Sequence, residues 1–359
     1  MMNVTDKIKT PKLKLAGLLQ DGAKSAEIIS LVYVSDKDPG ITRVKRGKGF
    51  VYVKNGKTIK DKNEIHRIRS LVIPPAWQNL WICYLPHGHL QATGYDAKNR
   101  KQYLYHPLWS QFRNQTKFNN LLEFGKKLPA IRERLEKDLA KPGLPFEKIL
   151  AAIVTIMQHT NIRVGNSEYE KLYGSFGLTT LKDRHVTING NHVKFCFKGK
   201  KGIYHEIDLK SRRLANIIKQ CRDIPGKELF QYYDENGEKR SVDSGMVNAY
   251  IKEMTGGDFT TKDFRTWMGT ANTISVLKEL GLCETEADAK KKTAEALDIV
   301  AKRLGNTRAV CKKYYVHPRV LDLYHSKELE KYFDKKTGAA TEKLSEEESI
   351  LLKVLKGGV

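Results

Sequence analysis

The chain has 359 residues, among them 64 lysines and arginines against 41 aspartates and glutamates, so its formal net charge is +23 at pH 7. Its 40% hydrophobic and 29% charged residues are typical of a globular protein rather than a disordered one. A chain of this length accommodates one large or two ordinary domains. So large a positive surplus needs an anionic partner. Nucleic acid comes first, because phosphate contacts from lysine and arginine supply most non-specific affinity.

Several other classes are disfavoured by what the sequence lacks. An anionic membrane surface ranks below nucleic acid, because we find neither a long apolar run nor a basic amphipathic anchor. The segment 1–11 lacks the apolar core of a signal peptide. The five cysteines form no CxxC pair, which argues against a zinc site or a disulfide framework and predicts reduced thiols in a cytosol. No GxxxxGK[ST] loop is present, so a P-loop nucleotide site is not expected.

The first part of the chain is predicted to be rich in β-strands. Residues that favour strands flank an Asn-Gly pair, which is a strong hairpin signal, and a second pair of strand-like segments flanks a Pro-His-Gly turn. Between the hairpins, apolar residues at helical spacing predict a helix that a Pro-Pro pair ends. The predicted elements cover residues 50–53, 58–59, 63–71, 81–84 and 89–93.

A basic segment, residues 96–103, follows these hairpins. If it binds DNA, Lys98, Arg100 and Lys101 meet the phosphate backbone, which positions a protein without reading sequence. Polar groups nearby, such as Gln91, then reach base edges. The alternative is that the segment is simply a solvated loop.

From residue 105 the pattern changes to helix. Segments 107–124 and 128–139 are amphipathic, and apolar residues at three- and four-residue spacing in 146–157 predict a helix with a well-buried face. Arg163 comes just after that helix, which would hold its guanidinium rigidly. The alternative is an arginine that merely stabilises the helix end through carbonyl groups.

Residues 185–207 predict a small three-stranded sheet, because alternating apolar residues are separated by an Asn-Gly turn and by a Gly-Lys-Lys-Gly turn. Lys200 lies in the second turn, where a long side chain can reach into a groove. The alternative is a lysine that only adds solubility. Further helices are predicted over 209–221 and 243–255.

The last part of the helical region brings together three further candidates. Lys262 and Arg265 lie three residues apart in a capped helix start, and therefore on one face. A helix over 285–304 ends at Gly305, and Asn306 then precedes Tyr315 by nine residues. A phenol beside cations is a plausible nucleophile, because positive charge favours the phenolate, although a lone tyrosine is more often structural.

The tail beyond residue 326 is charged and predicts one short helix over 344–355. Taken together, these patterns predict an α+β protein. A β-rich domain covers residues 1–105, a larger and mainly helical domain with the small sheet covers 106–326, and the tail covers 327–359.

Residues 45–320 resemble the type IB DNA topoisomerases of the short, poxvirus-like bacterial kind. The match rests on several independent motifs that occur in the right order. They are IPPAW at 73–77, GHLQATG at 88–94, IRVGN at 162–166, SFGLTTL at 175–181, KDFRTW at 262–267 and GNT at 305–307.

The resemblance implies a catalytic set of two arginines, a lysine on a β-turn, a histidine or asparagine, and a tyrosine, with a second lysine that assists proton transfer. In this chain the set falls on Arg163, Arg265, Lys200, Asn306, Tyr315 and Lys262. An asparagine replaces the histidine of the poxvirus relatives, and it can donate a hydrogen bond but cannot carry a proton. Tyr314 adjoins the proposed nucleophile, but successive helical residues point about 100° apart, so only one phenol can face the phosphate.

The resemblance also implies a function. The first domain and the catalytic domain would clamp duplex DNA, and we include Tyr169 among the candidate DNA contacts. The enzyme would nick one strand through a 3′-phosphotyrosyl intermediate, let the DNA rotate to relax supercoils, and religate it without ATP, metal or other cofactor. We expect a monomer in the cytoplasm, associated with the nucleoid and not with a membrane.

Two alternatives remain open from the sequence. A tyrosine recombinase has a similar catalytic domain, but recombinases usually carry His-x-x-Arg where this chain has Lys262 and Arg265, and their first domain is helical. A non-catalytic architectural DNA-binding protein would account for the charge. It would not need Arg163, Lys200, Arg265 and Tyr315 together.

Overall fold

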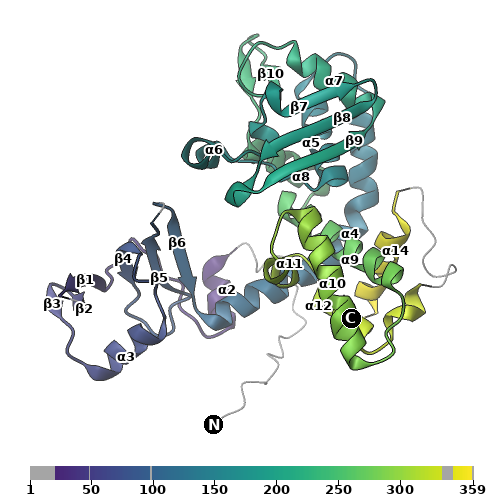
Figure 1. Cartoon of the computed structure of the whole chain (residues 1–359). Coiled ribbons are helices and arrows are strands. Elements are labelled where there is room, and N and C mark those ends of the chain that lie inside the picture. Colours follow the sequence, from purple (N-terminus) through teal and green to yellow (C-terminus); the bar gives the residue numbers. More distant parts are fainter. Residues whose placement is uncertain (1–20, 48, 98, 334–342, 358–359) are drawn as a thin grey trace. The chain divides into compact units, whose positions relative to one another are not determined.

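The computed structural model describes residues 21–47, 49–97, 99–333 and 343–357, and it divides the chain into two compact units, Met1–Asn120 and Leu121–Val359. Each unit contains helices and small antiparallel sheets (Figure 1), so the predicted α+β class is confirmed. The division falls inside one long helix, α4 (Pro107–Leu139). The residues beyond 326 that the structure describes belong to the second unit.

The first unit holds two three-stranded antiparallel sheets, with strand orders β1-β2-β3 and β4-β5-β6. Its elements are α2 (Gly22–Ile28), β1 (Thr42–Arg46), β2 (Gly49–Lys54), β3 (Lys57–Thr58), α3 (Lys62–Ser70), β4 (Gln78–Ile82), β5 (Leu90–Tyr95) and β6 (Lys101–Tyr105). A core of Ile41, Ile68, Leu80, Ile82 and Ala92 joins the sheets to α3.

Both predicted hairpins and the helix between them are confirmed. The first turn has positive φ at Asn55 (49°) and Gly56 (74°), the backbone that the Asn-Gly pair favours. Strands β1 and β6 were not predicted. Every residue of β1 is at least partly exposed, and every second residue of β6 is exposed, so neither strand carries a recognisable buried stripe. The basic segment 96–103 is therefore partly strand and not only loop.

Helix α4 runs through both segments that were predicted as separate amphipathic runs, as one helix of 33 residues with Pro129 inside it. In the first unit it packs Trp109 and Phe112 against Ala26, Ile29 and Leu31. In the second unit its residues from Leu121 to Leu139 join the main core. The interior proline removes one backbone hydrogen bond, but the apolar face of the helix remains continuous around it.

The second unit is mainly helical and encloses one large core. Its helices are α5 (Phe146–Thr160), α6 (Ser167–Tyr173), α7 (Arg212–Arg222), α8 (Ser244–Thr255), α9 (Thr261–Leu280), α10 (Glu286–Leu304), α11 (Arg308–Tyr314), α12 (Pro318–His325) and α14 (Glu346–Lys356). Short 3₁₀ turns are η1 (Leu178–Thr180), η2 (Asp183–His185), η3 (Lys200–Gly202) and η4 (Leu329–Tyr332). Its strands are β7 (Val186–Asn189), β8 (His192–Lys198), β9 (Tyr204–Lys210), β10 (Gln231–Tyr233) and β11 (Lys239–Ser241).

The small sheet β7-β8-β9 confirms the predicted three strands and their turns. Its alternating apolar residues, including Val193 and Phe195, are buried. The helix predicted from residue 209 begins later, at Arg212. Leu209 pairs with Val193 in the sheet, and the Ser211 side chain accepts a hydrogen bond from Leu214 N to cap the helix.

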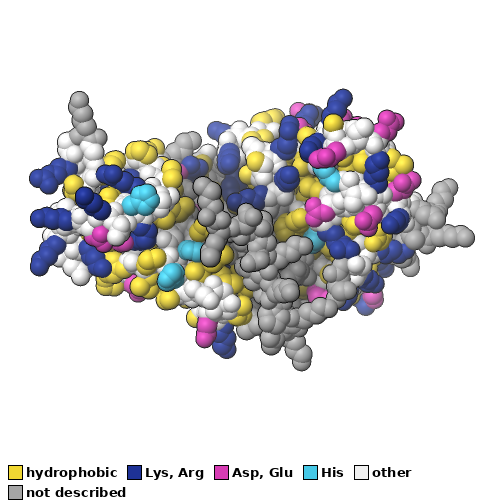
Figure 2. Space-filling model, turned by 90° about the horizontal axis from the view of Figure 1, so that it is seen from below, with side chains coloured by type: hydrophobic (Ala, Val, Ile, Leu, Met, Phe, Trp, Pro, Cys, Tyr) yellow, Lys and Arg dark blue, Asp and Glu magenta, His cyan; other side chains and the backbone are white. Residues whose placement is uncertain are grey.

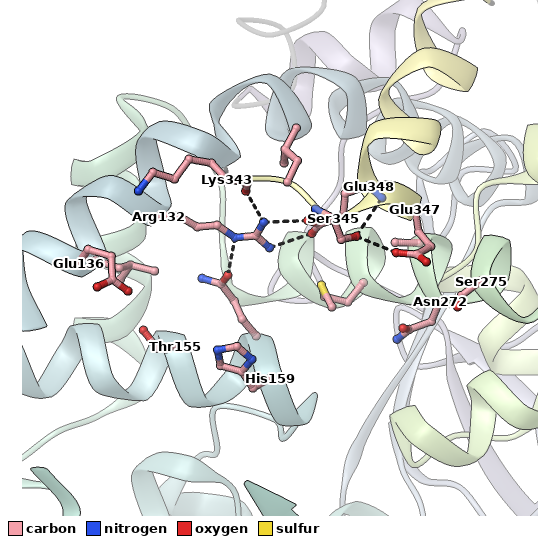
Figure 3. A pocket seen from close by; sticks show the side chains of 15 residues that line it. Arg132, Glu136, Thr155, His159, Asn272, Ser275, Lys343, Ser345, Glu347 and Glu348 are labelled. Atoms are coloured by element: carbon pink, nitrogen blue, oxygen red, sulfur yellow. Dashed lines mark hydrogen bonds and ion pairs between the residues drawn. The ribbon is translucent and has the colours of Figure 1, made fainter. Parts of the chain in front are cut away.

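The end of the chain is part of the second unit's core. Helix α14, predicted over 344–355, buries Ile350, Leu351, Val354 and Leu355. Its Glu348 is buried and accepts from both terminal nitrogens of Arg132 in α4 at 2.7 and 2.8 Å (Figure 3). Glu348 also accepts from Trp267 Nε1 in α9 at 2.9 Å. Burial alone would raise the pKa of the Glu348 carboxyl, but hydrogen bonds and the charge of Arg132 outweigh it and lower the pKa. This carboxylate therefore ties three helices together.

Replacing Glu348 with alanine is expected to destabilise the protein by about 3 kcal/mol, because it leaves the Arg132 guanidinium and the Trp267 indole without their buried acceptor. Equilibrium denaturant unfolding measures the change. Glu347→Ala is the matched control, since that side chain is partly exposed and accepts one hydrogen bond from Ser345. Equal losses for the two variants would contradict the role of Glu348.

Candidate active site

Arg163 follows α5 in a loop whose backbone is fixed from two sides. Helix α5 ends at Asn161, which adopts a left-handed conformation with φ of 57°. The Arg163 carbonyl then accepts from Leu178 N at 2.9 Å, and a Cβ on Gly177 would lie 2.6 Å from that same carbonyl oxygen. The IRVGN and SFGLTTL motifs therefore pack against each other, and this contact fixes the direction in which Arg163 leaves the backbone.

The Arg163 side chain reaches the segment after α10. Its Nη2 donates to Gly305 O at 3.1 Å and to Asn306 Oδ1 at 2.7 Å. Burial, followed by repulsion from Arg265, lowers the pKa of Arg163 to about 10, while the Tyr315 phenol acts in the opposite direction. Arg163 is still charged at neutral pH. The repulsion between these two guanidinium groups costs free energy. A phosphate bound between them would relieve that repulsion.

Arg265 lies on the buried side of α9 and is only 5% exposed. It donates to Leu304 O at 2.8 Å and to Asn161 O, so it bridges the ends of α10 and α5. Its guanidinium carbon is 5.2 Å from the centre of the Tyr315 ring. Burial lowers the pKa of Arg265, and the interaction with Tyr315 opposes that shift. A buried arginine with two carbonyl partners is held in one orientation.

Tyr315 directly follows α11 and caps its end, and α9 packs against its backbone. A Cβ on Gly269 would lie 2.6 Å from Tyr315 O, and the Thr270 hydroxyl, which donates to Thr266 O at 2.8 Å, also lies 3.3 Å from Tyr315 O. The same Thr270 hydroxyl accepts from His317 N at 3.1 Å. The sequence did not single out Gly269 or Thr270, because their importance depends on a contact with a distant segment.

The neighbouring phenol, Tyr314, has a different environment. It is 37% exposed, and the Lys313 ammonium lies 5.3 Å from its ring centre. Tyr315 instead is partly buried, packs on the core and faces Arg265. Of the two adjacent tyrosines, Tyr315 is therefore the one that the arginines surround.

Asn306 is oriented by Arg163. Gly305 caps the end of α10 with a positive φ of 61°. The backbone N–H of Asn306 then donates a hydrogen bond to Ala301 O at 2.8 Å. The Asn306 Oδ1 accepts from Arg163, whereas its Nδ2 is buried and has no hydrogen-bond partner within the described part of the chain. A buried donor without an acceptor is costly, and such groups concentrate at functional sites. An anion beside Arg163 would satisfy it.

Lys200 lies at the tip of the β8–β9 hairpin, as predicted. The turn closes through Gly199 N donating to Ile203 O at 2.7 Å, and Lys201 adopts a positive φ of 64°. Neighbouring atoms partly desolvate the ammonium, and together with repulsion from Arg163 this lowers the pKa of Lys200. The residue nevertheless keeps access to solvent. Its Nζ lies 6.0 Å from the centre of the Tyr169 ring, which is itself exposed on α6.

Lys262 is the remaining member of the implied set. It lies in the first turn of α9, three residues before Arg265, with an exposed side chain. Among the described residues, its ammonium forms no hydrogen bond or ion pair with the other five. The structure thus brings together Arg163, Arg265, Asn306, Tyr315 and the Lys200 turn, and leaves Lys262 near them on the surface of α9.

The residues expected to contact DNA from the first unit have mixed placements. Gln91 is only 3% exposed, and its amide donates to Pro86 O at 3.0 Å and to Gly88 O at 2.7 Å. The interpretation of Gln91 as a side chain that reads bases conflicts with this placement, since the amide holds the neighbouring turn instead. Arg100 pairs with Asp96 at 2.6 Å and Lys101 with Asp36 at 2.5 Å, although both cations remain partly exposed. Lys98 lies outside the described residues.

Other lysines and arginines of the first unit are exposed. In the space-filling view, lysine and arginine side chains are spread over its surface (Figure 2). The exposed ones include Lys45, Arg46, Lys54, Lys57, Lys60, Lys62 and Arg69. These residues could not be singled out from the sequence, because lysines scattered through strands and turns form no local motif.

None of the helices in the described segments combines the length and the apolar character that crossing a bilayer requires. Over the same segments, no three His, Cys, Asp or Glu side chains converge in a way that could hold a metal ion.

Comparison with known proteins agrees with the geometry. Residues 106–344 match the family described as eukaryotic DNA topoisomerase I, catalytic core, and residues 49–96 match the one described as bacterial DNA topoisomerase IB, N-terminal domain. The chain is 33% identical over 296 residues to DNA topoisomerase 1B of Acanthamoeba polyphaga mimivirus, covering 80% of this chain and 88% of the relative. It is 25% identical over 237 residues to DNA topoisomerase 1B of vaccinia virus (strain Copenhagen), covering 66% of this chain and 72% of the relative. A cluster of arginines around one tyrosine, on a chain with these relatives, identifies this protein as a member of the type IB DNA topoisomerase family.

Proposed function

We propose that Tyr315 is the nucleophile with which this topoisomerase cuts one strand of duplex DNA, leaving the protein joined to the 3′ phosphate. The observation that carries the proposal is the meeting of Arg163, Arg265 and Asn306 around Tyr315, from segments far apart in the sequence. In this step the Tyr315 phenol loses its proton to solvent, its oxygen forms a bond to phosphorus, and the bond from phosphorus to the 5′ oxygen of the next sugar breaks.

The two arginines and the asparagine would stabilise the transition state. Attack on a phosphodiester gathers negative charge on its non-bridging oxygens. The planar fork of an arginine matches those oxygens and stays charged. The free Nδ2 of Asn306 supplies a further donor beside Arg163. Because these groups are already held by carbonyls and by each other, little reorganisation is needed as the charge develops.

The leaving group is a sugar hydroxyl, which departs poorly unless it is protonated. Lys200 is the general acid in this proposal, because its lowered pKa suits it to give up a proton to the 5′ oxygen. Lys262 assists proton transfer from the first turn of α9 when DNA is bound. In religation the 5′ hydroxyl attacks the phosphotyrosine, its proton returns to Lys200, and Tyr315 leaves as the phenolate, which then takes a proton from solvent.

Relaxation follows from the covalent step. While one strand is cut, the DNA beyond the nick can rotate about the intact strand and release supercoils. One ester has replaced another, so the energy of the broken bond is kept in the adduct and no ATP is required. We propose a monomeric clamp in which residues 1–105 bind DNA together with the catalytic domain 106–326, and 327–359 form the tail. We further place the enzyme in the short, poxvirus-like bacterial subfamily and in the nucleoid.

Relaxation of a supercoiled plasmid in EDTA and without ATP tests this function. Wild-type protein is expected to relax the plasmid, and detergent added during the reaction is expected to trap protein on the 3′ end of a nicked strand. If the protein bound the plasmid but neither relaxed it nor formed an adduct, the tyrosine recombinase and the architectural protein would become the better explanations. Substrates carrying paired recombination sites would then separate those two.

A further inference from the structure

One aromatic side chain beside the active site has no role in the mechanism above. His205 lies in β9, where it pairs with Phe197 of β8, and the two rings stack with centroids 5.1 Å apart and an interplanar angle of 24°. The imidazole is partly buried. Since neither ring nitrogen has a hydrogen-bond partner in the described part of the chain, the ring is held by packing.

Two glycines make room for this ring, and each directly precedes a proposed active-site residue. A Cβ on Gly199 would lie 2.5 Å from His205 Cδ2, and a Cβ on Gly305 would lie 2.5 Å from His205 Cε1. Both distances are too short for a real contact, so only glycine fits at either position while the ring stays in place. Gly199 is followed by Lys200, and Gly305 by Asn306. The imidazole is therefore in contact with both backbones at once.

The charge environment explains why a histidine suits this place. Burial lowers the pKa of His205, and the nearby Arg163 and Arg265 guanidinium groups lower it further. The ring is thus neutral at neutral pH, and a flat neutral ring can stand beside two arginines and Lys200 where another cation would repel them.

We propose that His205 is a positioning residue, whose imidazole is a rigid spacer between the Lys200 turn and the segment of Gly305 and Asn306. The spacer sets how far the proton donor stands from the groups that bind the phosphate, so that both act on one phosphodiester. This inference rests on the proposed role of Lys200 as general acid. It makes His205 a determinant of the leaving-group step without direct contact with DNA.

The test uses His205→Ala and a pair of DNA substrates that differ in one atom. One has the normal 5′ oxygen at the cleavage site, and the other has sulfur there. A thiolate leaves without being protonated, so it does not need Lys200. On the oxygen substrate we expect single-turnover cleavage to slow by about 10- to 100-fold, since small misplacements of a catalytic group have effects of this size. On the sulfur substrate we expect the defect to shrink at least about tenfold, with DNA binding almost unchanged.

Two further variants keep the test independent of folding. His205→Phe keeps a flat ring and is expected to restore most of the cleavage rate on the oxygen substrate. Gly199→Ala adds a methyl group that would collide with the His205 ring. This variant is expected to cleave the oxygen substrate slowly and to recover on the sulfur substrate, and it tests the spacer role even if His205→Ala does not fold. Wild-type rates for His205→Ala, or equal defects on both substrates in all folded variants, would overturn the spacer role.

Lys200→Ala and Tyr315→Phe separate this inference from the function on which it rests. Lys200→Ala is expected to cleave the oxygen substrate slowly and to recover its cleavage rate on the sulfur substrate. Tyr315→Phe is expected to cleave neither substrate. If Lys200→Ala did not recover, the assignment of the general acid would fail. If it recovered while His205→Ala did not, only the positioning role would be lost.

Discussion

Replacing Tyr315 with phenylalanine is expected to abolish DNA cleavage and relaxation, with a loss on the order of 10⁴- to 10⁶-fold, as for other enzymes that lose their nucleophile. Phenylalanine keeps the ring that lies over Arg265 and removes only the attacking oxygen. DNA binding and the temperature of unfolding should therefore hardly change. The measurement is the fraction of labelled DNA strand that becomes joined to protein in a single turnover, together with a binding titration at the same salt concentration.

Tyr314→Phe is the matched control, because it removes the same atom from the adjacent residue. Tyr314 is exposed and its ring lies against Lys313, so this variant should cleave at close to the wild-type rate. If Tyr314→Phe were inactive while Tyr315→Phe still formed the adduct, the enzyme class would stand and the nucleophile would have to be reassigned.

Changing Arg265 to lysine is expected to slow cleavage by about 10²- to 10³-fold, although the positive charge is kept, which is the cost typical of losing one transition-state donor. The arginine already donates to Asn161 O and Leu304 O, and its remaining face lies against Tyr315. A single ammonium cannot hold both carbonyls and also present two parallel donors to a phosphate. Single-turnover rates of cleavage and religation should fall together, because both pass through the same transition state.

Arg303→Lys is the control for charge and for position near the end of α10. That arginine is exposed, so its replacement should change cleavage less than about twofold, as expected for an exposed substitution. Cleavage by Arg265→Lys within threefold of wild type would show that charge alone is sufficient. A moderate loss of stability is also expected for Arg265→Lys, since one buried carbonyl would be left without a donor.

Much of this protein could be predicted from sequence because the relevant signals are local. The Asn55-Gly56 turn, the alternation around Val193 and Phe195, and the capped start of α9 each lie within a few residues, and each forms as predicted. The proposed catalytic residues could be named from the resemblance to a known family, because most of them lie in its short motifs, Lys200 lies in a predicted turn, and Tyr315 follows Asn306 by nine residues.

The tertiary structure decided whatever depends on residues far apart in the chain. Gln91 lies near the basic segment that suggested DNA contact, yet it is buried, because its amide bonds the carbonyl groups of the turn at 85–88. The charged tail ends in a helix whose Glu348 bonds Arg132 and Trp267, partners no local pattern could supply.

The same distinction holds at the candidate active site. The sequence by itself determined which residue types are available and the order in which they occur. Only the fold decided that Gly269 and Thr270 fix the backbone of Tyr315, and that His205 fits between the two glycines that precede Lys200 and Asn306. The physical reason is that hydrogen bonds and close packing act between atoms a few ångströms apart, and sequence periodicity records only the contacts that lie within one helix or hairpin.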